Sequence, residues 1–291
     1  MAKAVVVGSG FGGLAAAVRL AARGHRVTLV ERQAQLGGRA MVFRDQGFTY
    51  DAGPTVITAP FLFEELFALA GRRLADYVKL VPVDPFYRVL FPDGRKFDYR
   101  GDLEQMIEEV RAFEPRDVDG FLKLARHADR IYATGFEKLA DVPFSSLSDM
   151  LRAVPAMVRL RSDRSVYQAV SRCLRSPELR QVFTFQPLLV GGHPFRTSSI
   201  YLLIQSLERK HGVHFPLGGT GALVQALARL ASELGVETRT STTVDQIEVA
   251  NGSVKGVSLT GEGRLDAELV VCNADPGFVY SKLLQIGRAH V

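Results

Sequence analysis

Cysteine is scarce in this sequence. The two cysteines, Cys173 and Cys272, lie far apart and lack the paired spacing of a disulfide framework or a zinc site. We therefore expect neither a disulfide scaffold nor a metal site. A reducing cytoplasm is the compartment that this cysteine usage favours.

Long hydrophobic runs and nucleic-acid signatures are also missing. No apolar run reaches the roughly 18 residues of a membrane span, and the run at residues 4–7 breaks into glycines instead of a signal-peptide cleavage site. The arginines are scattered without an aromatic-basic platform, so nucleic-acid binding is not expected. These absences leave a globular protein that works without a spanning helix.

The charge balance has two explanations. The 291 residues include 36 Lys and Arg against 31 Asp and Glu, which gives a net charge of +5 and a pI near 9.3. A solvated surface with extra arginine explains this excess. Attraction to an anionic membrane face explains it too, because each basic group near such a surface contributes about 1 kcal/mol.

The first residues have the pattern of a βαβ unit that binds an adenine dinucleotide. Residues 3–7 and 26–31 are typical of buried strands, and residues 12–23 of a helix. Glu31 ends the second strand, where it can accept hydrogen bonds from ribose hydroxyls, and its charge argues against NADP. NAD and FAD are equally compatible with these elements.

The turn of this unit carries the G-x-G-x-x-G fingerprint, Gly8-Ser9-Gly10-Phe11-Gly12-Gly13. Gly8 would permit the tight turn, Gly10 would admit a pyrophosphate, and Gly13 would let the helix close onto the strand. The free N–H groups of the helix start would then hold the phosphates.

A second glycine-rich loop favours FAD over NAD. Gln35-Leu36-Gly37-Gly38-Arg39 follows Glu31 closely, and Asp51-Ala52-Gly53-Pro54-Thr55-Val56 follows that loop. A guanidinium group pairs bidentately with phosphate oxygens, so we expect Arg39 to bind the pyrophosphate. A second loop suits a cofactor whose flavin end must also be held.

The rest of the chain indicates an insertion. Residues 87–91 and 95–99 predict a hairpin, residues 102–210 are almost wholly helical in pattern, and residues 236–272 return to strands. The predicted fold is α/β, with a FAD-binding Rossmann-like βαβ domain interrupted by a largely helical substrate domain. We expect the FAD-binding domain over residues 1–60 and 215–285, and a membrane-associated substrate domain over residues 61–214.

From Ala4 to Leu284 the sequence resembles the bacterial-type phytoene desaturases, flavoproteins of the amine-oxidase and glutathione-reductase-like superfamily. The glycine motifs are shared widely among flavin oxidases, whereas several later segments are more specific to the carotenoid branch. These segments are Asp149-Met150-Leu151-Arg152-Ala153, Leu188-Leu189-Val190-Gly191-Gly192, Thr197-Ser198-Ser199-Ile200-Tyr201, Phe215-Pro216-Leu217-Gly218-Gly219-Thr220-Gly221-Ala222-Leu223 and Asn273-Ala274-Asp275.

This resemblance implies an FAD-dependent desaturation of phytoene, a long polyene hydrocarbon, to a more conjugated carotene such as lycopene. A hydride would pass to flavin N5, and the electrons would go on to quinone or oxygen. Val244 would offer its backbone to the adenine, and Gly53, Pro54 and Thr55 would lie near the flavin ring. The FAD-binding residues expected in full are Gly8, Ser9, Gly10, Phe11, Gly12, Gly13, Glu31, Arg32, Gly38, Arg39, Gly53, Pro54, Thr55 and Val244.

Residues 147–160 carry two further expectations. Asp149 and Arg152 are the catalytic candidates, although an i,i+3 surface pair explains them too. The helix predicted here is amphipathic, as in an interfacial membrane element or a helix whose apolar face packs on the protein core. Because a long hydrocarbon has no aqueous pool, we favour a peripheral position on the inner face of the cell membrane. The apolar residues are Leu147, Met150, Leu151, Val154, Met157, Val158 and Leu160.

The end of the sequence departs from the resemblance. Ile286-Gly287-Arg288-Ala289-His290-Val291 matches nothing in the family and is also what a widely used sequencing adapter encodes. We therefore expect residues 286–291 to be artefact, and the C-terminal part of the family fold to be missing. The alternatives to an active phytoene desaturase are an inactive fragment, a related carotenoid oxidoreductase (a C30 diapophytoene desaturase, an isomerase or a saturase) and a flavin-free lipid chaperone of the GDP-dissociation-inhibitor type.

Overall fold

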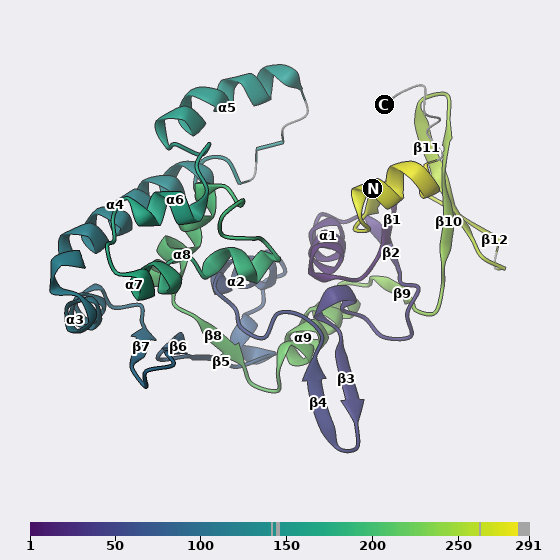
Figure 1. The fold of residues 1–291 in the computed structure, drawn as a ribbon. Coiled ribbons are helices and arrows are strands. Elements are labelled where there is room, and N and C mark those ends of the chain that lie inside the picture. The colour runs from purple at the N-terminus through teal and green to yellow at the C-terminus, as the bar shows by residue number, and fades with distance from the viewer. Residues whose placement is uncertain (141, 144–145, 262, 285–291) are drawn as a thin grey trace. The chain divides into compact units, whose positions relative to one another are not determined.

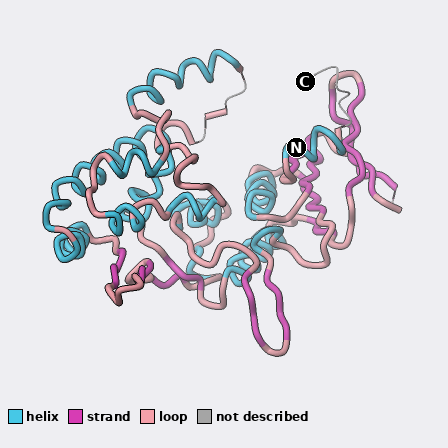
Figure 2. Tube along the Cα trace, in the orientation of Figure 1, coloured by secondary structure: helices cyan, strands magenta, loops and turns pink. Residues whose placement is uncertain are grey.

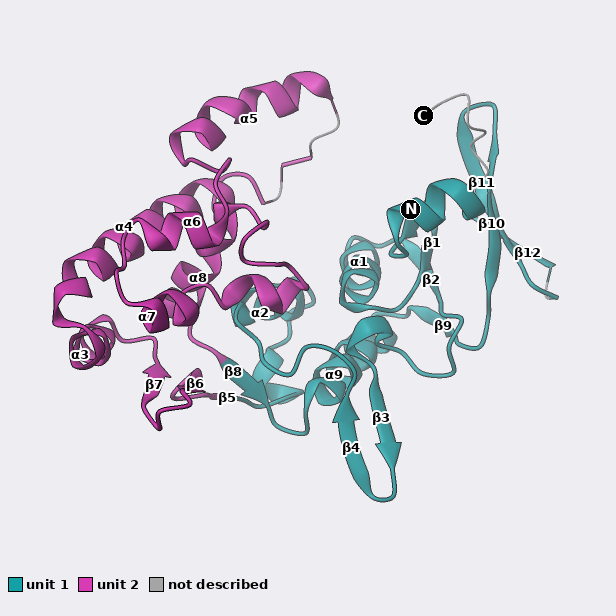
Figure 3. Cartoon of the chain, viewed as in Figure 1, with its two compact units in different colours: residues 1–81, 214–291 teal, residues 82–213 magenta. Residues whose placement is uncertain are grey.

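The computed structural model describes residues 1–140, 142–143, 146–261 and 263–284. It divides into two compact units, the sheet unit (residues 1–81 and the chain from residue 214 onward) and the helical unit (residues 82–213) (Figure 3). Strands and helices mix in the sheet unit, whereas helices dominate the helical unit (Figure 2). The expected artefact at residues 286–291 lies outside the described residues.

A parallel four-stranded sheet organises the sheet unit (Figure 1). Its strands lie in the order β13 (Leu269–Cys272), β1 (Lys3–Val7), β2 (Arg26–Val30) and β9 (Glu237–Arg239). Val6 of β1 contacts one hydrophobic core and Val5 the other, which explains the continuous apolar run of a strand buried on both faces. The strands predicted at residues 3–7 and 26–31 are confirmed.

Each face of this sheet has its own cover. The helices α1 (Phe11–Ala22), α2 (Pro60–Leu69) and α9 (Thr220–Glu233) share one core with Val6. The antiparallel strands β10 (Val244–Ala250), β11 (Ser253–Leu259) and β12 (Gly263–Asp266) share the other core with Val5. The sheet unit also contains shorter elements, among them β3 (Val42–Asp45), β4 (Phe48–Asp51), β5 (Leu80–Pro82), β8 (His214–Pro216) and α10 (Pro276–Phe278).

The hairpin of β3 and β4 is not predicted from the sequence. Its turn residues Gln46 and Gly47 have positive φ values of +47° and +83°, as a tight hairpin turn requires. Most of its side chains are exposed, among them Phe48 and Tyr50, so its strands lack the buried face of a half-buried strand.

The boundary expected at residues 60–61 differs from the one in the structure, which lies at residues 81–82. The helix α2 buries Leu66 and Phe67 in the core that also holds Leu14 and Leu223. This helix therefore folds with the sheet unit. The chain returns to the sheet unit at residues 213–214, one residue before the expected boundary.

The helical unit has one core of aromatic and aliphatic side chains. The hairpin of β6 (Tyr87–Leu90) and β7 (Lys96–Tyr99) confirms the predicted one, and Phe97 is fully buried in this core. The helices are α3 (Leu103–Phe113), α4 (Val118–Gly135), α5 (Leu147–Arg159), α6 (Val166–Ser171), α7 (Pro177–Val182) and α8 (Leu203–His211). Across the described residues of both units, no helix has the length and apolar character needed to cross a membrane.

Candidate functional site

The glycine loop between β1 and α1 is tightly closed. Gly8 has a φ of +91°, and its N–H donates to the carbonyl of Val30 at 2.8 Å. A Cβ on Gly13 would lie 1.9 Å from the carbonyl oxygen of Gly8, a distance that no side chain tolerates. Glycine at these two positions therefore lets α1 pack directly on β1, as the sequence predicts.

Asn273 covers this loop from the end of β13. Its backbone N–H donates to the carbonyl of Val7 at 2.8 Å, which continues the pairing of β13 with β1. A Cβ on Gly10 would lie 2.9 Å from its Nδ2, and a Cβ on Gly12 would lie 2.6 Å from its Oδ1. The amide of Asn273 thus lies against the start of α1. The sequence predicts no role for Asn273, because no local pattern connects it to residues 8–13.

Glu31 holds the loop from the end of β2. Its buried carboxylate accepts hydrogen bonds from the Ser9 N–H at 2.8 Å, the Ser9 hydroxyl at 2.6 Å and the Gln33 N–H at 2.9 Å. Hydrogen bonds to a carboxylate are charge-assisted and offset the cost of burying it. A carboxylate accepts about four hydrogen bonds, so acceptor capacity is left for a ribose hydroxyl. That contact stays a prediction.

The second glycine loop lies beside the first. The N–H of Gly37 donates to the carbonyl of Ser9 at 3.2 Å, and a Cβ on Gly38 would lie 3.1 Å from the Cα of Gly10. The side chains of Arg32 and Arg39 are exposed, and neither forms an ion pair or hydrogen bond with another described residue. Both guanidinium groups are therefore available to an anion, the role expected of Arg39.

The loop after β4 lies against the start of α9. The hydroxyl of Thr220 donates to the carbonyl of Pro54, and a Cβ on Gly53 would lie 2.4 Å from the carbonyl oxygen of Arg39. Beside Gly219, Asp51 Oδ1 is buried and has no hydrogen-bond partner in the described structure. A polar group of a bound cofactor would satisfy such an acceptor.

These loops fit a pyrophosphate-bearing cofactor such as FAD. The N-cap of α1, Gly10, makes no side-chain cap hydrogen bond, so the N–H groups of the first turn are available to phosphate. Val244 begins β10 and is buried beside Val30 in the same core. Its contact with an adenine stays a prediction, as do the contacts expected of Phe11 and Thr55.

Asp149 and Arg152 lie together on α5 in the helical unit. The hydroxyl of Ser146, the N-cap of α5, donates to Asp149 Oδ2 at 2.6 Å. Asp149 Oδ1 lies 3.5 Å from Nη1 of Arg152, as an i,i+3 ion pair. Both line a cavity of about 500 Å³ with apolar side chains such as Leu139 and Leu160. Their catalytic role stays a prediction.

The apolar face of α5 is uncovered within the helical unit. Ala153 is the buried residue of this helix, whereas Leu147 is 73% and Val158 is 63% exposed. Within the helical unit this face is therefore not packed on the core, although Leu160, just beyond α5, is buried. Packing on another part of the protein stays an alternative to the membrane. The exposed apolar face of α5 consists of Leu147, Met150, Leu151, Val154, Met157 and Val158.

Glu208 on α8 is a buried acid that the sequence does not predict. Its Oε2 has no hydrogen-bond partner in the described structure, and burial raises the pKa of this carboxyl to about 8. Close by, the amide of Gln186 donates to the Tyr87 hydroxyl at 3.0 Å, and the amide of Gln205 donates to Gln186 Oε1 at 3.3 Å. A glutamate on a helix rich in charge is normally solvated, so no signal in the sequence marks this one as buried.

Comparisons with known proteins agree with this geometry. Residues 11–288 match the family described as flavin containing amine oxidoreductase. The phytoene desaturase (lycopene-forming) of Pseudescherichia vulneris is 48% identical over 284 residues, which are 98% of this chain and 58% of that protein. The corresponding protein of Pantoea ananas is 47% identical with the same coverage. The chain thus spans less than two thirds of the length of these relatives.

Solved structures share the fold at low sequence identity. Putrescine oxidase bound to putrescine superposes with a TM-score of 0.64 at 19% identity, over 97% of this chain and 60% of that one. An oxidoreductase from Methanosarcina mazei gives a TM-score of 0.59 at 19% identity, over 93% and 58%. The predicted α/β FAD-binding fold, the resemblance to the desaturases and the FAD cofactor are confirmed. The chain belongs to the family of flavin-containing amine oxidoreductases.

Proposed function

We propose that this chain acts in the FAD-dependent desaturation of phytoene to a more conjugated carotene such as lycopene. The observation that carries the proposal is 48% identity over 98% of the chain to a lycopene-forming phytoene desaturase. The glycine loop and Glu31 support the proposal, because a flavin-free lipid chaperone needs no phosphate-binding loop. The C30 alternative has weaker support, since a 4,4'-diapophytoene desaturase of Staphylococcus haemolyticus is 31% identical.

Each part of the site has a task in this reaction. FAD, when bound, supplies a hydride acceptor at N5. The start of α1 and Arg39 would bind the pyrophosphate, Val244 would face the adenine, and the loop of Gly53 and Thr55 would lie near the flavin ring. The electrons would pass on to quinone or oxygen.

Asp149 and Arg152 are the proposed catalytic pair. Loss of a hydride from a polyene leaves a carbocation that conjugation stabilises, so a weak base suffices to take the remaining proton. We assign that proton to the carboxylate of Asp149, with Arg152 as its charge partner. Their position on the wall of a partly apolar cavity supports this assignment.

A membrane is the proposed source of the substrate. We propose that the exposed apolar face of α5 inserts into the inner face of the cell membrane, since a hydrocarbon substrate dissolves in lipid and not in water. Exposed apolar side chains on a helix with arginines on its other side support an interfacial position.

Carotenoid analysis tests the reaction. The chain is expressed in cells that accumulate phytoene, and the pigments are separated by chromatography. We expect coloured carotenes from the wild-type chain and a loss of about 10²-fold or more in the Asp149→Asn/Arg152→Gln variant, the scale of general-base catalysis. Unchanged phytoene beside flavin-loaded protein would contradict the proposal.

A matched control separates catalysis from surface charge. Glu108 and Arg111 of α3 form an exposed i,i+3 ion pair of the same type. The Glu108→Gln/Arg111→Gln variant should retain its carotene yield. Equal yields from the two double variants would identify Asp149 and Arg152 as an ordinary surface pair.

A further inference from the structure

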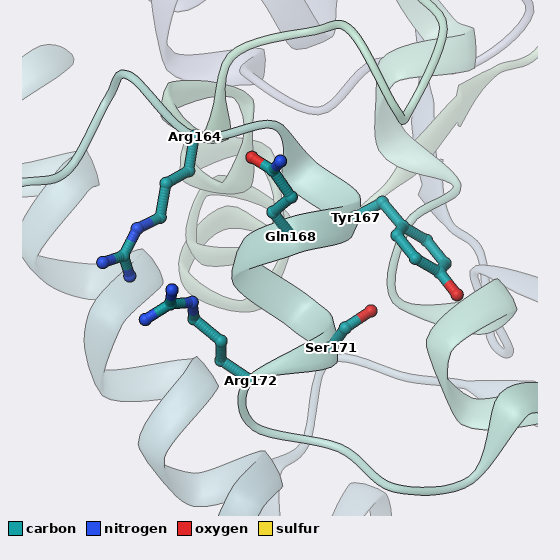
Figure 4. A pocket seen from close by; sticks show the side chains of 5 residues that line it. All are labelled: Arg164, Tyr167, Gln168, Ser171 and Arg172. Atoms are coloured by element: carbon teal, nitrogen blue, oxygen red, sulfur yellow. The ribbon is translucent and has the colours of Figure 1, made fainter.

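A cavity of about 330 Å³ lies on α6 in the helical unit, whereas the glycine loops belong to the sheet unit. Figure 4 shows the side chains of Arg164 and Arg172 on one side of α6, with their guanidinium groups directed toward each other. Gln168 lies midway between them in the sequence, and the spacing of four residues places all three on one side of the segment. Tyr167 and Ser171 complete the lining.

The helix α4 adds a second row of basic groups. Lys123, His127 and Arg130 follow one another at the i,i+4 and i+7 spacing of one helix face. Burial lowers the pKa of His127, and the positive charges of Arg130 and Arg164 lower it further, so these groups lie close together. A Cβ on Gly120 would lie 1.9 Å from the carbonyl oxygen of Cys173, which places α4 directly beside the end of α6.

The five basic groups of this surface lack anionic partners. Among the described residues, none of them forms an ion pair. Other arginines of the same unit are paired, as Arg209 is with Asp129 at 2.6 Å. We call this surface the α4–α6 basic site, formed by Lys123, His127, Arg130, Arg164 and Arg172. The unpaired charges of Lys123, Arg130, Arg164 and Arg172 repel one another, so an anion that joins them is favoured. His127, whose pKa is lowered, is neutral at neutral pH and offers a ring N–H.

Hydrogen-bond donors of this site are also uncommitted. The Oε1 of Gln168 accepts the N–H of Ser165 at 3.0 Å, so its amide N–H groups remain available as donors. The Oγ of Ser171 is buried and has no hydrogen-bond partner in the described structure. The carbonyl of Arg164 accepts the N–H of Ser199 at 2.7 Å, which fixes the backbone at this point.

We propose that the α4–α6 basic site binds the phosphate of an anionic lipid head group. Two guanidinium groups match the charge and bidentate geometry of phosphate oxygens. Residues 160–165 join α6 to α5, whose exposed apolar face would enter the same membrane. The lipid source rests on the membrane position proposed above, whereas binding of a phosphate group does not depend on desaturation.

Vesicle flotation tests the lipid source. The chain is mixed with vesicles of phosphatidylcholine, or of phosphatidylcholine with phosphatidylglycerol, at low salt. We expect phosphatidylglycerol to strengthen binding of the wild-type chain. In the Arg164→Gln/Arg172→Gln variant, this increase in binding should be smaller by about tenfold or more. The Arg23→Gln/Arg44→Gln control removes the same charge from exposed, unpaired arginines of the sheet unit and should keep the gain.

Two results would overturn the proposal. Equal losses in the two double variants would mean that anionic lipid responds only to net charge. If phosphatidylglycerol did not strengthen binding of the wild-type chain, an anionic lipid would be excluded as the ligand. If inorganic phosphate nevertheless bound at these arginines, the ligand would be a soluble phosphate. An unchanged circular dichroism spectrum verifies folding of each variant. Carotene yield is scored separately, so failure of desaturation and failure of this inference are distinguishable.

Discussion

The carboxylate of Glu31 and the backbone of Ser9 form the central hydrogen bond of the cofactor loop, at 2.8 Å from N–H to Oε2. The Ser9 hydroxyl adds a second hydrogen bond to the same oxygen at 2.6 Å. One acid thus fixes the middle of the glycine loop before any cofactor contacts it. The loop geometry depends on this acid as well as on the glycines.

The Glu31→Gln substitution should destabilise the sheet unit. The amide keeps the shape of the side chain but replaces charge-assisted hydrogen bonds with weaker ones, and its NH₂ group cannot accept a hydrogen bond from Ser9. We expect the free energy of unfolding to fall by about 2 kcal/mol, measured by urea denaturation. Glu64→Gln, at an exposed glutamate of α2, should change it by less than about 0.5 kcal/mol. Equal stabilities would show that the Glu31 charge does not hold the loop.

The Gly13→Ala substitution should separate α1 from β1. The new methyl group would meet the backbone oxygen of Gly8, which cannot rotate away as a side chain can. We expect a loss of at least about 2 kcal/mol in the free energy of unfolding, together with loss of bound flavin. Gly135→Ala is the matched control, because its Cβ would find its nearest neighbours at 3.7 to 3.8 Å. Flavin retained at wild-type level in Gly13→Ala would contradict this account.

The sequence predicts those parts of the site that local patterns determine. Val5 to Val7, the glycines and Glu31 lie within one short stretch, and strand alternation and turn chemistry act at that range. Asn273 could not be predicted, because only the parallel pairing of β13 with β1 brings it to residues 8–13. The hairpin at Gln46 could not be predicted for another reason. Almost all of its side chains are exposed, so no buried apolar pattern marks its strands.

The helix α5 shows a different limit of sequence analysis. Its amphipathic pattern predicts the helix but not what covers the apolar face. A protein core and a membrane interface both favour apolar residues on one face of a helix, so the sequence does not distinguish them. Only the exposures of residues such as Leu147 and Val158 distinguish the two within the helical unit.

Charge on that face should weaken vesicle binding. In the Leu151→Asp/Val158→Asp variant, two exposed apolar side chains become carboxylates. Insertion of a carboxylate into a bilayer interface costs free energy, because the charge loses part of its hydration. We expect binding to phosphatidylcholine vesicles to fall by about tenfold or more in a flotation assay. Leu90→Asp is the control, since Leu90 is 73% exposed on β6. A parallel loss in Leu90→Asp would argue against a specific role for α5.

Glu208 should make the stability of the helical unit depend on pH. Burial raises its pKa to about 8, so the folded state keeps the proton at pH values where the unfolded chain has lost it. The folded state therefore binds more protons, and its stability falls as the pH rises from the ordinary pKa of about 4.3 towards 8.

The Glu208→Gln variant should lose this dependence. Glutamine keeps the size of the protonated acid but does not ionise, so the variant should be more stable than wild type at pH 8 by up to about 5 kcal/mol, at 1.36 kcal/mol per pKa unit. Near pH 4 the two proteins should differ little. Urea denaturation at both pH values measures this, with the exposed Glu104→Gln as control. The Glu208 carboxyl lies close to Gln186, beside a core rich in aromatic side chains. If the stability of Glu208→Gln still depended on pH in the same way, another group would be responsible for the dependence.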